Sequence, residues 1–311
     1  MASTAEECAE LRAKHYNATI VSLKHRHSDL VVMRVQPDAP AAVHKPGQYT
    51  TLGMGQWEPR APGCQDEVPK PNEDRKLIRR AYSLSCSVLD ESGNLFDLAQ
   101  QPWLEFYVVL VRESDKGPPA LTPRLFTLKE GDRVFLGDKI AGHFTLDPVK
   151  PTDSVVFLST GTGEAPHNYM LWQLLRSGHQ GQILAACCVR YKKDLAYLPI
   201  QEELMRRYPN YIYLSLTTRE ADDLDHKVYI QDLISSGQLE EKLKRPLDPA
   251  GMHVFMCGNP KMIGVPEVDK ATGATVFPKT LGVCELLMKK GFTLDQPSQK
   301  LKGTIHFEEY W

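Results

Sequence analysis

The stretch SVVFLSTGTGEAP, residues 154–166, decides the fold of this chain. Its apolar run at 155–158 is typical of a strand buried on both faces of a parallel sheet. Gly161-Thr162-Gly163 follows, and Pro166 suits the first turn of a helix because no backbone N–H is needed there. Glycines at such a turn let the backbone approach a pyrophosphate, which the positive end of the helix dipole favours. The pattern is not G-x-G-x-x-G, so a merely tight turn stays open as an alternative.

Strand and helix patterns alternate along the chain after residue 151. Apolar runs predict strands over 154–158, 183–189, 211–217 and 252–257. Helical spacing predicts helices over 167–177, 199–208, 229–236 and 279–290, and a polar tail ends the chain. This alternation is typical of right-handed βαβ units and predicts a doubly wound α/β domain over 151–311.

The first 150 residues show a different pattern of apolar segments and turns. Short alternating segments separated by turns predict strands over 19–23, 30–35, 49–52, 81–87, 104–111 and 133–137, after a helix over 4–15 that Thr4 caps. Without long helices between them, these strands predict an antiparallel β-barrel or sandwich over 1–150. Residues 53–78 are rich in Gly and Pro and interrupt the pattern. We interpret them as a tolerated surface insertion, with a functional or mobile loop as the alternative.

Composition excludes several classes of protein. The 311 residues suit two domains, and 37 basic against 39 acidic side chains argue against a nucleic-acid or membrane-surface protein. Seven cysteines without a C-x-x-C pair predict neither a disulfide framework nor a zinc or iron–sulfur site, and favour reduced thiols in the cytoplasm. We expect no signal peptide and no membrane-spanning helix.

Cations follow successive strands of the predicted parallel sheet. Sites for NAD usually place an acidic residue at the end of the second strand, but Arg190 stands there. Thr218 and Arg219 end the third strand, and Lys227 follows. Together they favour the 2′-phosphate of NADP, although each cation alone is more often a solvated charge.

A further motif, Arg80-Ala81-Tyr82-Ser83, lies on a predicted strand of the first half. Alternation puts Arg80 and Tyr82 on one face and Ser83 on the other. Spacing alone favours an ordinary strand.

Six motifs in order change that interpretation. They are Arg80-Ala81-Tyr82-Ser83, residues 104–109, Leu121-Thr122-Pro123-Arg124-Leu125, Gly161-Thr162-Gly163, Cys257-Gly258-Asn259-Pro260 and the terminal Tyr310-Trp311. The series resembles the ferredoxin–NADP reductase family, most of all its bacterial ferredoxin/flavodoxin–NADP reductases, from about residue 17 to residue 311. Three features depart from the compact bacterial pattern: the insertions at 53–78 and 264–278, and Glu164-Ala165 after the glycines.

The resemblance implies an N-terminal FAD-binding barrel. Arg80 would pair with the FAD phosphates, Tyr82 would lie against the isoalloxazine ring, and Ser83 would hydrogen-bond near flavin N5. Further flavin contacts would come from Tyr107, Val108, Val109 and Leu110, and backbone donors to the pyrophosphate from Ala120, Leu121 and Thr122. The terminal Tyr310 and Trp311 would pack on FAD.

It also implies an NADP-binding second domain. Thr162 would sit between flavin and nicotinamide, and Cys257 would face the nicotinamide ring, although the sequence alone favours a buried small apolar residue there. Glu308 or Glu309 would help to move protons near the flavin, with a solvated tail as the alternative. Arg190, Thr218, Arg219 and Lys227 match the positions that select the 2′-phosphate.

The implied function is that of a cytoplasmic, monomeric flavoenzyme. It would exchange hydride between nicotinamide C4 and flavin N5, and single electrons with ferredoxin or flavodoxin. Arg60, Lys70, Arg75 and Lys76 are candidates for a basic docking patch, interspersed with acids. Two alternatives stay open: an NADH-linked flavin reductase that serves an oxygenase or haem protein, and a flavin-free nucleotide-binding regulatory protein.

Overall fold

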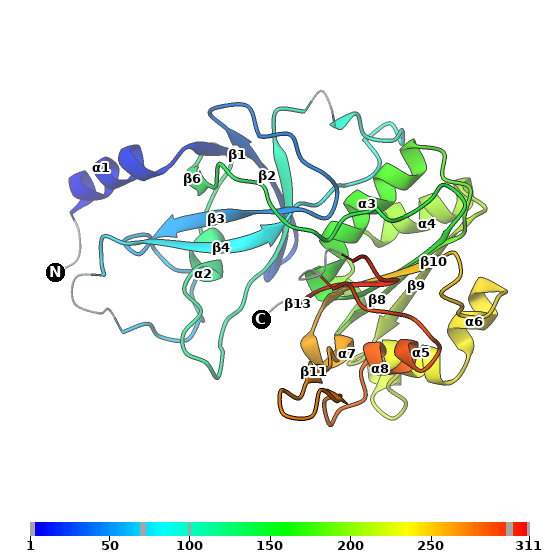
Figure 1. Cartoon of the computed structure of the whole chain (residues 1–311). Helices are drawn as coiled ribbons and strands as arrows, with labels where there is room; N and C mark the ends of the chain where they lie inside the picture. The colour runs from blue at the N-terminus through cyan, green and yellow to red at the C-terminus, as the bar shows by residue number, and fades with distance from the viewer. Residues whose placement is uncertain (1–3, 69–72, 99–100, 297–300, 310–311) are drawn as a thin grey trace. The chain divides into compact units, whose positions relative to one another are not determined.

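The computed structural model describes residues 4–68, 73–98, 101–296 and 301–309, and it divides into two compact units (Figure 1). The N-terminal unit comprises Met1–Cys86 and Phe96–His143, and the C-terminal unit comprises Ser87–Leu95 and Phe144–Trp311. Among the described residues, no helix is long and apolar enough to span a membrane.

The N-terminal unit is built on a six-stranded antiparallel sheet with strand order β4-β3-β6-β1-β2-β5. Its strands are β1 (Ala18–His27), β2 (Leu30–Pro37), β3 (Tyr49–Gly55), β4 (Leu77–Ser83), β5 (Leu104–Val109) and β6 (Arg133–Leu136). Just after β4, Ser85 forms an antiparallel bridge with Glu105 of β5, so the two outer strands are joined and the sheet closes as a barrel. The expected antiparallel barrel is confirmed.

The α-helices of this unit among the described residues are α1 (Ala5–His15) and α2 (Thr122–Leu125). Thr4 caps α1 as predicted: its hydroxyl accepts a hydrogen bond from the backbone of Glu7, whose carboxylate accepts one from the backbone of Thr4. The strand predicted over 81–87 lies four residues earlier in the structure, where β4 begins at Leu77 and ends at Ser83.

The C-terminal unit contains a five-stranded parallel sheet with strand order β13-β10-β7-β8-β9. Its strands are β7 (Ser154–Thr160), β8 (Ile183–Val189), β9 (Tyr211–Thr217), β10 (Met252–Gly258) and β13 (Ile305–Glu309). The predicted doubly wound α/β fold is confirmed. The end of the chain is more than a polar tail, however, since Ile305–Glu309 pairs with β10 as an edge strand.

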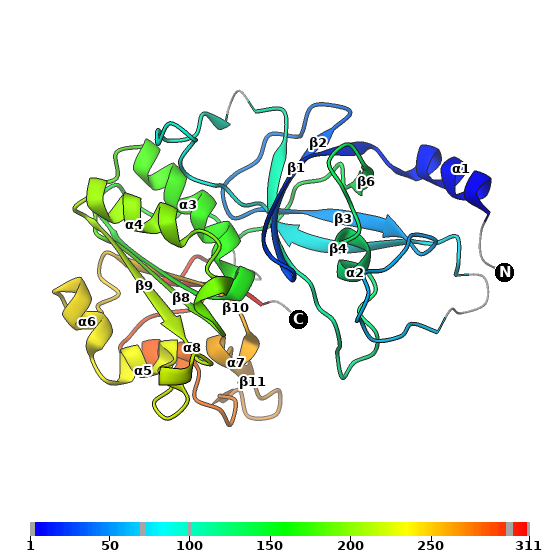
Figure 2. The same cartoon turned by 180° about the vertical axis from the view of Figure 1, so that it is seen from behind.

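Helices cover both faces of this sheet (Figures 1 and 2). The helices α3 (Glu164–Arg176) and α4 (Leu198–Arg207) lie on one face. On the other lie α5 (Ile230–Ser235), α6 (Gln238–Leu243) and α8 (Val283–Met288), which bury a core with Val156, Leu184 and Val254 of the strands. The remaining short elements are η2 (Gly161–Gly163), η3 (Lys192–Asp194), η4 (Ala221–Asp223), α7 (Pro260–Ile263) and the hairpin β11 (Glu267–Val268) and β12 (Thr275–Val276).

Candidate functional site

The parallel sheet changes winding direction between β7 and β10. From β7 the chain proceeds outward through β8 and β9, and then returns to add β10 and β13 on the other side. Ligands of such sheets bind beyond the carboxyl ends of the strands at this switch point. Gly161-Thr162-Gly163 follows β7, and Asn259-Pro260 follows β10, so both predicted motifs lie at that place.

The two loops at the switch point are in close contact. A Cβ atom on Gly163 would lie 2.1 Å from the carbonyl oxygen of Cys257, and one on Gly258 would lie 2.2 Å from Oγ1 of Thr160. The same Thr160 hydroxyl oxygen accepts a hydrogen bond of 2.7 Å from the backbone N–H of Asn259. Glycine is therefore required at both positions, and the backbone of the Gly161–Gly163 turn is held against the end of β10.

Cys257 and Glu308 are neighbours in the sheet. They pair in the parallel register of β10 with β13, and Cys257 is also paired with Ser159 of β7. Cys257 is fully buried, whereas Glu308 is partly exposed. The structure therefore brings together two of the three predicted catalytic residues within the C-terminal unit.

The ends of β8 and β9 bring together three of the residues predicted for the 2′-phosphate. The carbonyl of Arg190 accepts hydrogen bonds from the backbone of Thr218 at 3.3 Å and of Arg219 at 2.8 Å. Arg190, Arg219 and Lys227 are all exposed. Arg190 lies 3.5 Å from Asp194, whereas Arg219 and Lys227 make no side-chain ion pair within the described part of the chain.

A buried polar cluster beside the Gly161–Gly163 turn was not expected from the sequence. Glu164, the first residue of α3, accepts hydrogen bonds from the hydroxyl of Tyr213 at 2.9 Å and from Nε2 of Gln201 at 3.1 Å. Gln201 also donates to Asn168 and accepts from the hydroxyl of Tyr211, both at 2.7 Å. Burial raises the pKa of Glu164 to about 7, although both hydrogen bonds oppose the shift. The one signal in the sequence was a charged residue directly after Gly161-Thr162-Gly163.

The segments predicted for FAD are linked to one another in the N-terminal unit. The Ser85–Glu105 bridge joins the end of the Arg80–Ser83 strand to β5. Beyond β5, the backbone of Val111 donates a hydrogen bond of 3.1 Å to the hydroxyl of Thr122, at the start of α2. Tyr107, Val108, Leu110 and Leu121 are buried, whereas Val109, Ala120 and Thr122 are partly exposed.

Within the Arg80–Ser83 strand, exposure decreases along the chain. Arg80 and Ala81 are exposed, Tyr82 is half-buried and Ser83 is buried. The guanidinium of Arg80 donates to the carbonyl of Arg79 at 2.8 Å and has no carboxylate partner among the described residues. Desolvation raises the pKa of the Tyr82 phenol, and the charge of Arg80 partly offsets that effect.

The 53–78 insertion is tied to the predicted pyrophosphate segment. Arg124, only 3% exposed, donates to the carbonyl of Ala120 at 2.7 Å, to the carbonyl of Gln56 at 3.0 Å and to Glu67 at 2.7 Å. The backbone of Ala61 in turn donates to the carbonyl of Pro123 at 2.8 Å. The segment is therefore more than a tolerated surface insertion, since Gln56, Ala61 and Glu67 form hydrogen bonds with Arg124 and Pro123 of α2.

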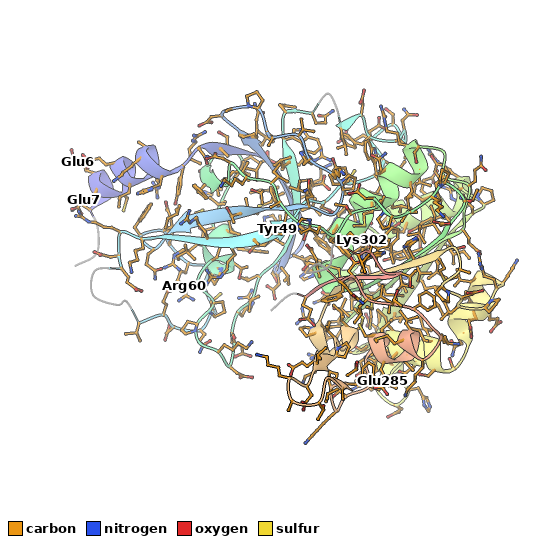
Figure 3. All side chains as sticks on the ribbon, in the orientation of Figure 1. Glu6, Glu7, Tyr49, Arg60, Glu285 and Lys302 are labelled. Atoms are coloured by element: carbon orange, nitrogen blue, oxygen red, sulfur yellow. The ribbon has the colours of Figure 1, made fainter. Side chains whose placement is uncertain are left out.

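The predicted basic patch is neutralised by acidic partners. Arg60, labelled in Figure 3, lies 3.8 Å from Glu67; Arg75 pairs with Glu7, and Lys76 pairs with Glu73. Lys70 lies outside the described residues, as do Tyr310 and Trp311.

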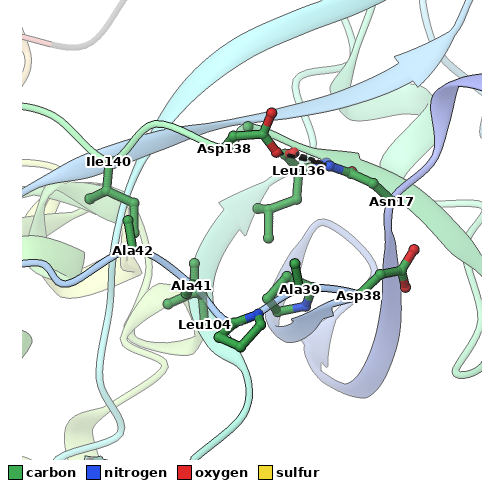
Figure 4. A pocket seen from close by; sticks show the side chains of 12 residues that line it. Asn17, Asp38, Ala39, Ala41, Ala42, Leu104, Leu136, Asp138 and Ile140 are labelled. Carbon is green, nitrogen blue, oxygen red and sulfur yellow. Dashed lines mark hydrogen bonds between the residues drawn. The ribbon is translucent and has the colours of Figure 1, made fainter.

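A pocket of about 380 Å³ lies elsewhere in the N-terminal unit, among Asn17, residues 37–42, Leu104, residues 136–138 and Ile140 (Figure 4). Asn17 donates to the carbonyl of Leu136 at 2.8 Å, and Asp38 and Asp138 contribute carboxylates. Carboxylates disfavour a phosphate, and none of the residues predicted for FAD lines this pocket.

Comparisons with known proteins agree with these features. The family model described as "Oxidoreductase NAD-binding domain" matches residues 157–267. A flavodoxin/ferredoxin–NADP reductase of Escherichia coli (strain K12) is 31% identical over 226 residues, which are 72% of this chain and 78% of that protein. One from Buchnera aphidicola subsp. Schizaphis graminum is 25% identical and covers 88% of this chain and 91% of its own.

Solved structures share the fold. A ferredoxin NADP+ reductase from Neisseria gonorrhoeae with bound FAD and NADP superposes with a TM-score of 0.66 at 20% identity, covering 94% of this chain and 97% of its own. A ferredoxin–NADP+ reductase from Plasmodium falciparum with 2′P-AMP has a TM-score of 0.63 at 15% identity, covering 96% and 97%. With its motifs, its fold and these relatives in agreement, the chain belongs to the ferredoxin–NADP reductase family.

Proposed function

We propose that the protein is an FAD-dependent reductase that transfers electrons between NADP(H) and ferredoxin or flavodoxin. The observation that carries this proposal is the switch point of the parallel sheet. There the loops after β7 and β10 pack so closely that Gly163 and Gly258 cannot be replaced by a residue with a side chain. Arg219 and Lys227, which have no ion-pair partner among the described residues, support the choice of a phosphorylated dinucleotide.

The residues present fit NADP. The positive end of the dipole of α3, which is 13 residues long, suits a pyrophosphate. Arg219 and Lys227 are exposed without ion-pair partners among the described residues, so they are available to a 2′-phosphate. Arg190 and Thr218 complete this proposed group.

The residues present also fit FAD. Arg80 is an exposed cation without a carboxylate partner in the described part of the chain, on the same strand as a half-buried tyrosine. In our proposal Arg80 binds the FAD phosphates and Tyr82 packs on the flavin, while Ala81 spans the two. Tyr107–Leu110 and Ala120–Thr122 supply the remaining contacts, with Tyr310 and Trp311 as further candidates.

When bound, the cofactors supply hydride exchange between nicotinamide C4 and flavin N5, and the flavin's capacity to pass electrons singly. The chain's own residues bind, orient and exclude water. Ser83 is proposed to donate a hydrogen bond to the flavin, and Thr162 and Cys257 to position the nicotinamide. Glu308 is proposed to hold or move a proton.

The proposed assignment places FAD with residues 1–150 and NADP with residues 151–311. Ferredoxin or flavodoxin is the proposed partner because the curated relatives named above carry both in their names. A monomeric state and a cytoplasmic location remain part of this proposal.

The test is reduction of purified ferredoxin and flavodoxin by the FAD-loaded protein, with NADPH or NADH as donor. We expect carrier reduction with NADPH and a much lower rate with NADH. Carrier reduction that prefers NADH would contradict the proposed role of Arg219 and Lys227. It would favour an NADH-linked flavin reductase that serves an oxygenase or haem protein.

A further inference from the structure

Glu164 has a buried carboxyl group and directly follows the Gly161–Gly163 turn. It is the first residue of α3 and only 3% exposed. Its backbone N–H donates to the carbonyl of Gly161, so the residue belongs to the same turn as Gly161-Thr162-Gly163. The backbone of Glu164 therefore forms part of the turn where phosphate is proposed to bind, and its side chain extends from that turn to Gln201 of α4 and Tyr213 of β9.

The surroundings of Glu164 contain only neutral donors. Oε1 accepts from Tyr213 and Gln201, whereas Oε2 is buried without a hydrogen-bond partner. No lysine, arginine or histidine of the described residues forms an ion pair with it. A buried carboxylate without a cation favours its protonated form, and the pKa is accordingly raised to about 7.

Other titratable groups packed around Glu164 stay neutral near this pH. Burial raises the pKa of Cys187 on β8 and of Tyr211 and Tyr213 on β9, and the charge of Glu164 adds to each shift. Burial lowers the pKa of His167, on α3 itself, to about 3. Of these groups, Glu164 is thus the one whose pKa lies near 7.

A bound dinucleotide would add negative charge at this turn. An ionised Glu164 repels that charge in a poorly screened environment, whereas the neutral acid does not. We propose that binding of NADP(H) at the Gly161–Gly163 turn is coupled to proton uptake by Glu164, which makes this side chain an electrostatic determinant of nucleotide affinity. The inference rests on the proposed function.

The size of the effect follows from linkage. If bound phosphate raises the pKa of Glu164 by about one unit, the Kd for NADP+ rises about fivefold between pH 7 and pH 9. Under the same assumption, binding takes up about half a proton at pH 7.5. The 2′-phosphate itself titrates near pH 6, so it is already ionised across this window.

The experiment measures NADP+ binding to the FAD-loaded protein by calorimetry from pH 7 to pH 9. Repeating it in buffers of different ionisation enthalpy gives the number of protons taken up. For the wild type we expect the Kd increase and proton uptake given above. For Glu164→Gln we expect a Kd that is constant within twofold and no uptake.

Two further variants sharpen the test. Glu202→Gln removes an exposed carboxylate from α4 and should keep the wild-type profile. Tyr213→Phe removes a hydrogen bond that lowers the pKa of Glu164, so it should move the rise in Kd to higher pH. This variant decides the question should Glu164→Gln fail to fold.

Each outcome has a clear consequence. A wild-type Kd that does not change with pH, or an unchanged pH dependence in Glu164→Gln or Tyr213→Phe, would overturn the proton coupling and leave the proposed function intact. Absence of NADP+ binding at every pH would instead contradict the proposed function itself.

Discussion

Cys257 and Glu308 lie opposite each other where β10 pairs with β13, at the carboxyl end of the parallel sheet. Partners in a parallel register project their side chains to the same face. The fully buried thiol and the partly exposed carboxyl group therefore project to the same face of the sheet, next to the turn that Gly163 packs against the backbone of Cys257.

Replacing the thiol tests its proposed positioning role. Cys257→Ser should slow flavin reduction by NADPH about tenfold, because small displacements of the reacting groups are costly, and should leave the Kd for NADP+ within twofold. Stopped-flow absorbance measures the rate. Cys284→Ser, at another fully buried cysteine of the same unit, is the control and should affect stability only. Equal loss of rate in both variants would refute a specific role for Cys257.

Arg219 and Lys227, which follow β9 and have no ion-pair partner in the described part of the chain, should select the phosphorylated nucleotide. Arg219→Ala and Lys227→Ala should each raise the KM for NADPH about 10-fold or more, since hydrogen bonds to charged groups contribute about 1.5–3 kcal/mol. The KM for NADH should hardly change. Lys242→Ala, at an exposed lysine of α6, is the control. Equal effects on both nucleotides would refute a 2′-phosphate contact.

Arg80 should hold FAD. Arg80→Ala should raise the Kd for FAD at least about tenfold through loss of charge-assisted hydrogen bonds to phosphate. Fluorescence of released flavin measures this affinity. Arg79, its neighbour on the opposite face of β4, lies 5.6 Å from the centre of the Phe135 ring and provides the matched control Arg79→Ala. Stronger flavin loss from the control would contradict the assignment.

Glu67 should contribute pH-dependent stability through Arg124. Burial would raise the pKa of Glu67, but hydrogen bonds from Gln56 and Arg124 outweigh it and leave the pKa lowered. A lowered pKa stabilises the fold above about pH 4.3, the usual value in unfolded chains, and that contribution is lost as the pH falls through the folded value. Glu67→Gln should therefore cost about 1.5–3 kcal/mol at pH 7 and little at pH 3.

Urea unfolding at both pH values measures this difference. Glu73→Gln removes an exposed ion pair with Lys76 and should change stability by less than about 1 kcal/mol. A Glu67→Gln variant as stable as the wild type at pH 7 would show that the contact of residues 53–78 with Arg124 of α2 does not stabilise the fold.

Most of the fold was predictable because its signals are local. The apolar run of β7, the glycines after it and the capping box at Thr4 each act within a few residues. The edge strand Ile305–Glu309 was missed because a short, partly exposed strand with two glutamates has no marked apolar pattern. Its pairing with β10 depends on tertiary contacts.

The location of the candidate site was predictable from the sequence, but the contacts within it were not. Motif positions identified the two loops at the switch point, but not their contact between Gly163 and Cys257. The Glu164 cluster draws on α3, α4 and β9, and the Arg124–Glu67 pair joins residues 57 positions apart. No periodicity encodes such long-range polar contacts, so they emerge only from the folded chain.

The account's central claim is that this chain binds FAD and that NADPH reduces it. The most direct measurement is the absorption spectrum of the purified protein during anaerobic titration with NADPH and with NADH. We predict flavin bands at about 380 and 450 nm, with the second band bleached at much lower concentrations of NADPH than of NADH. A colourless protein that FAD cannot reconstitute, or a flavin that NADPH does not reduce, would contradict the claim.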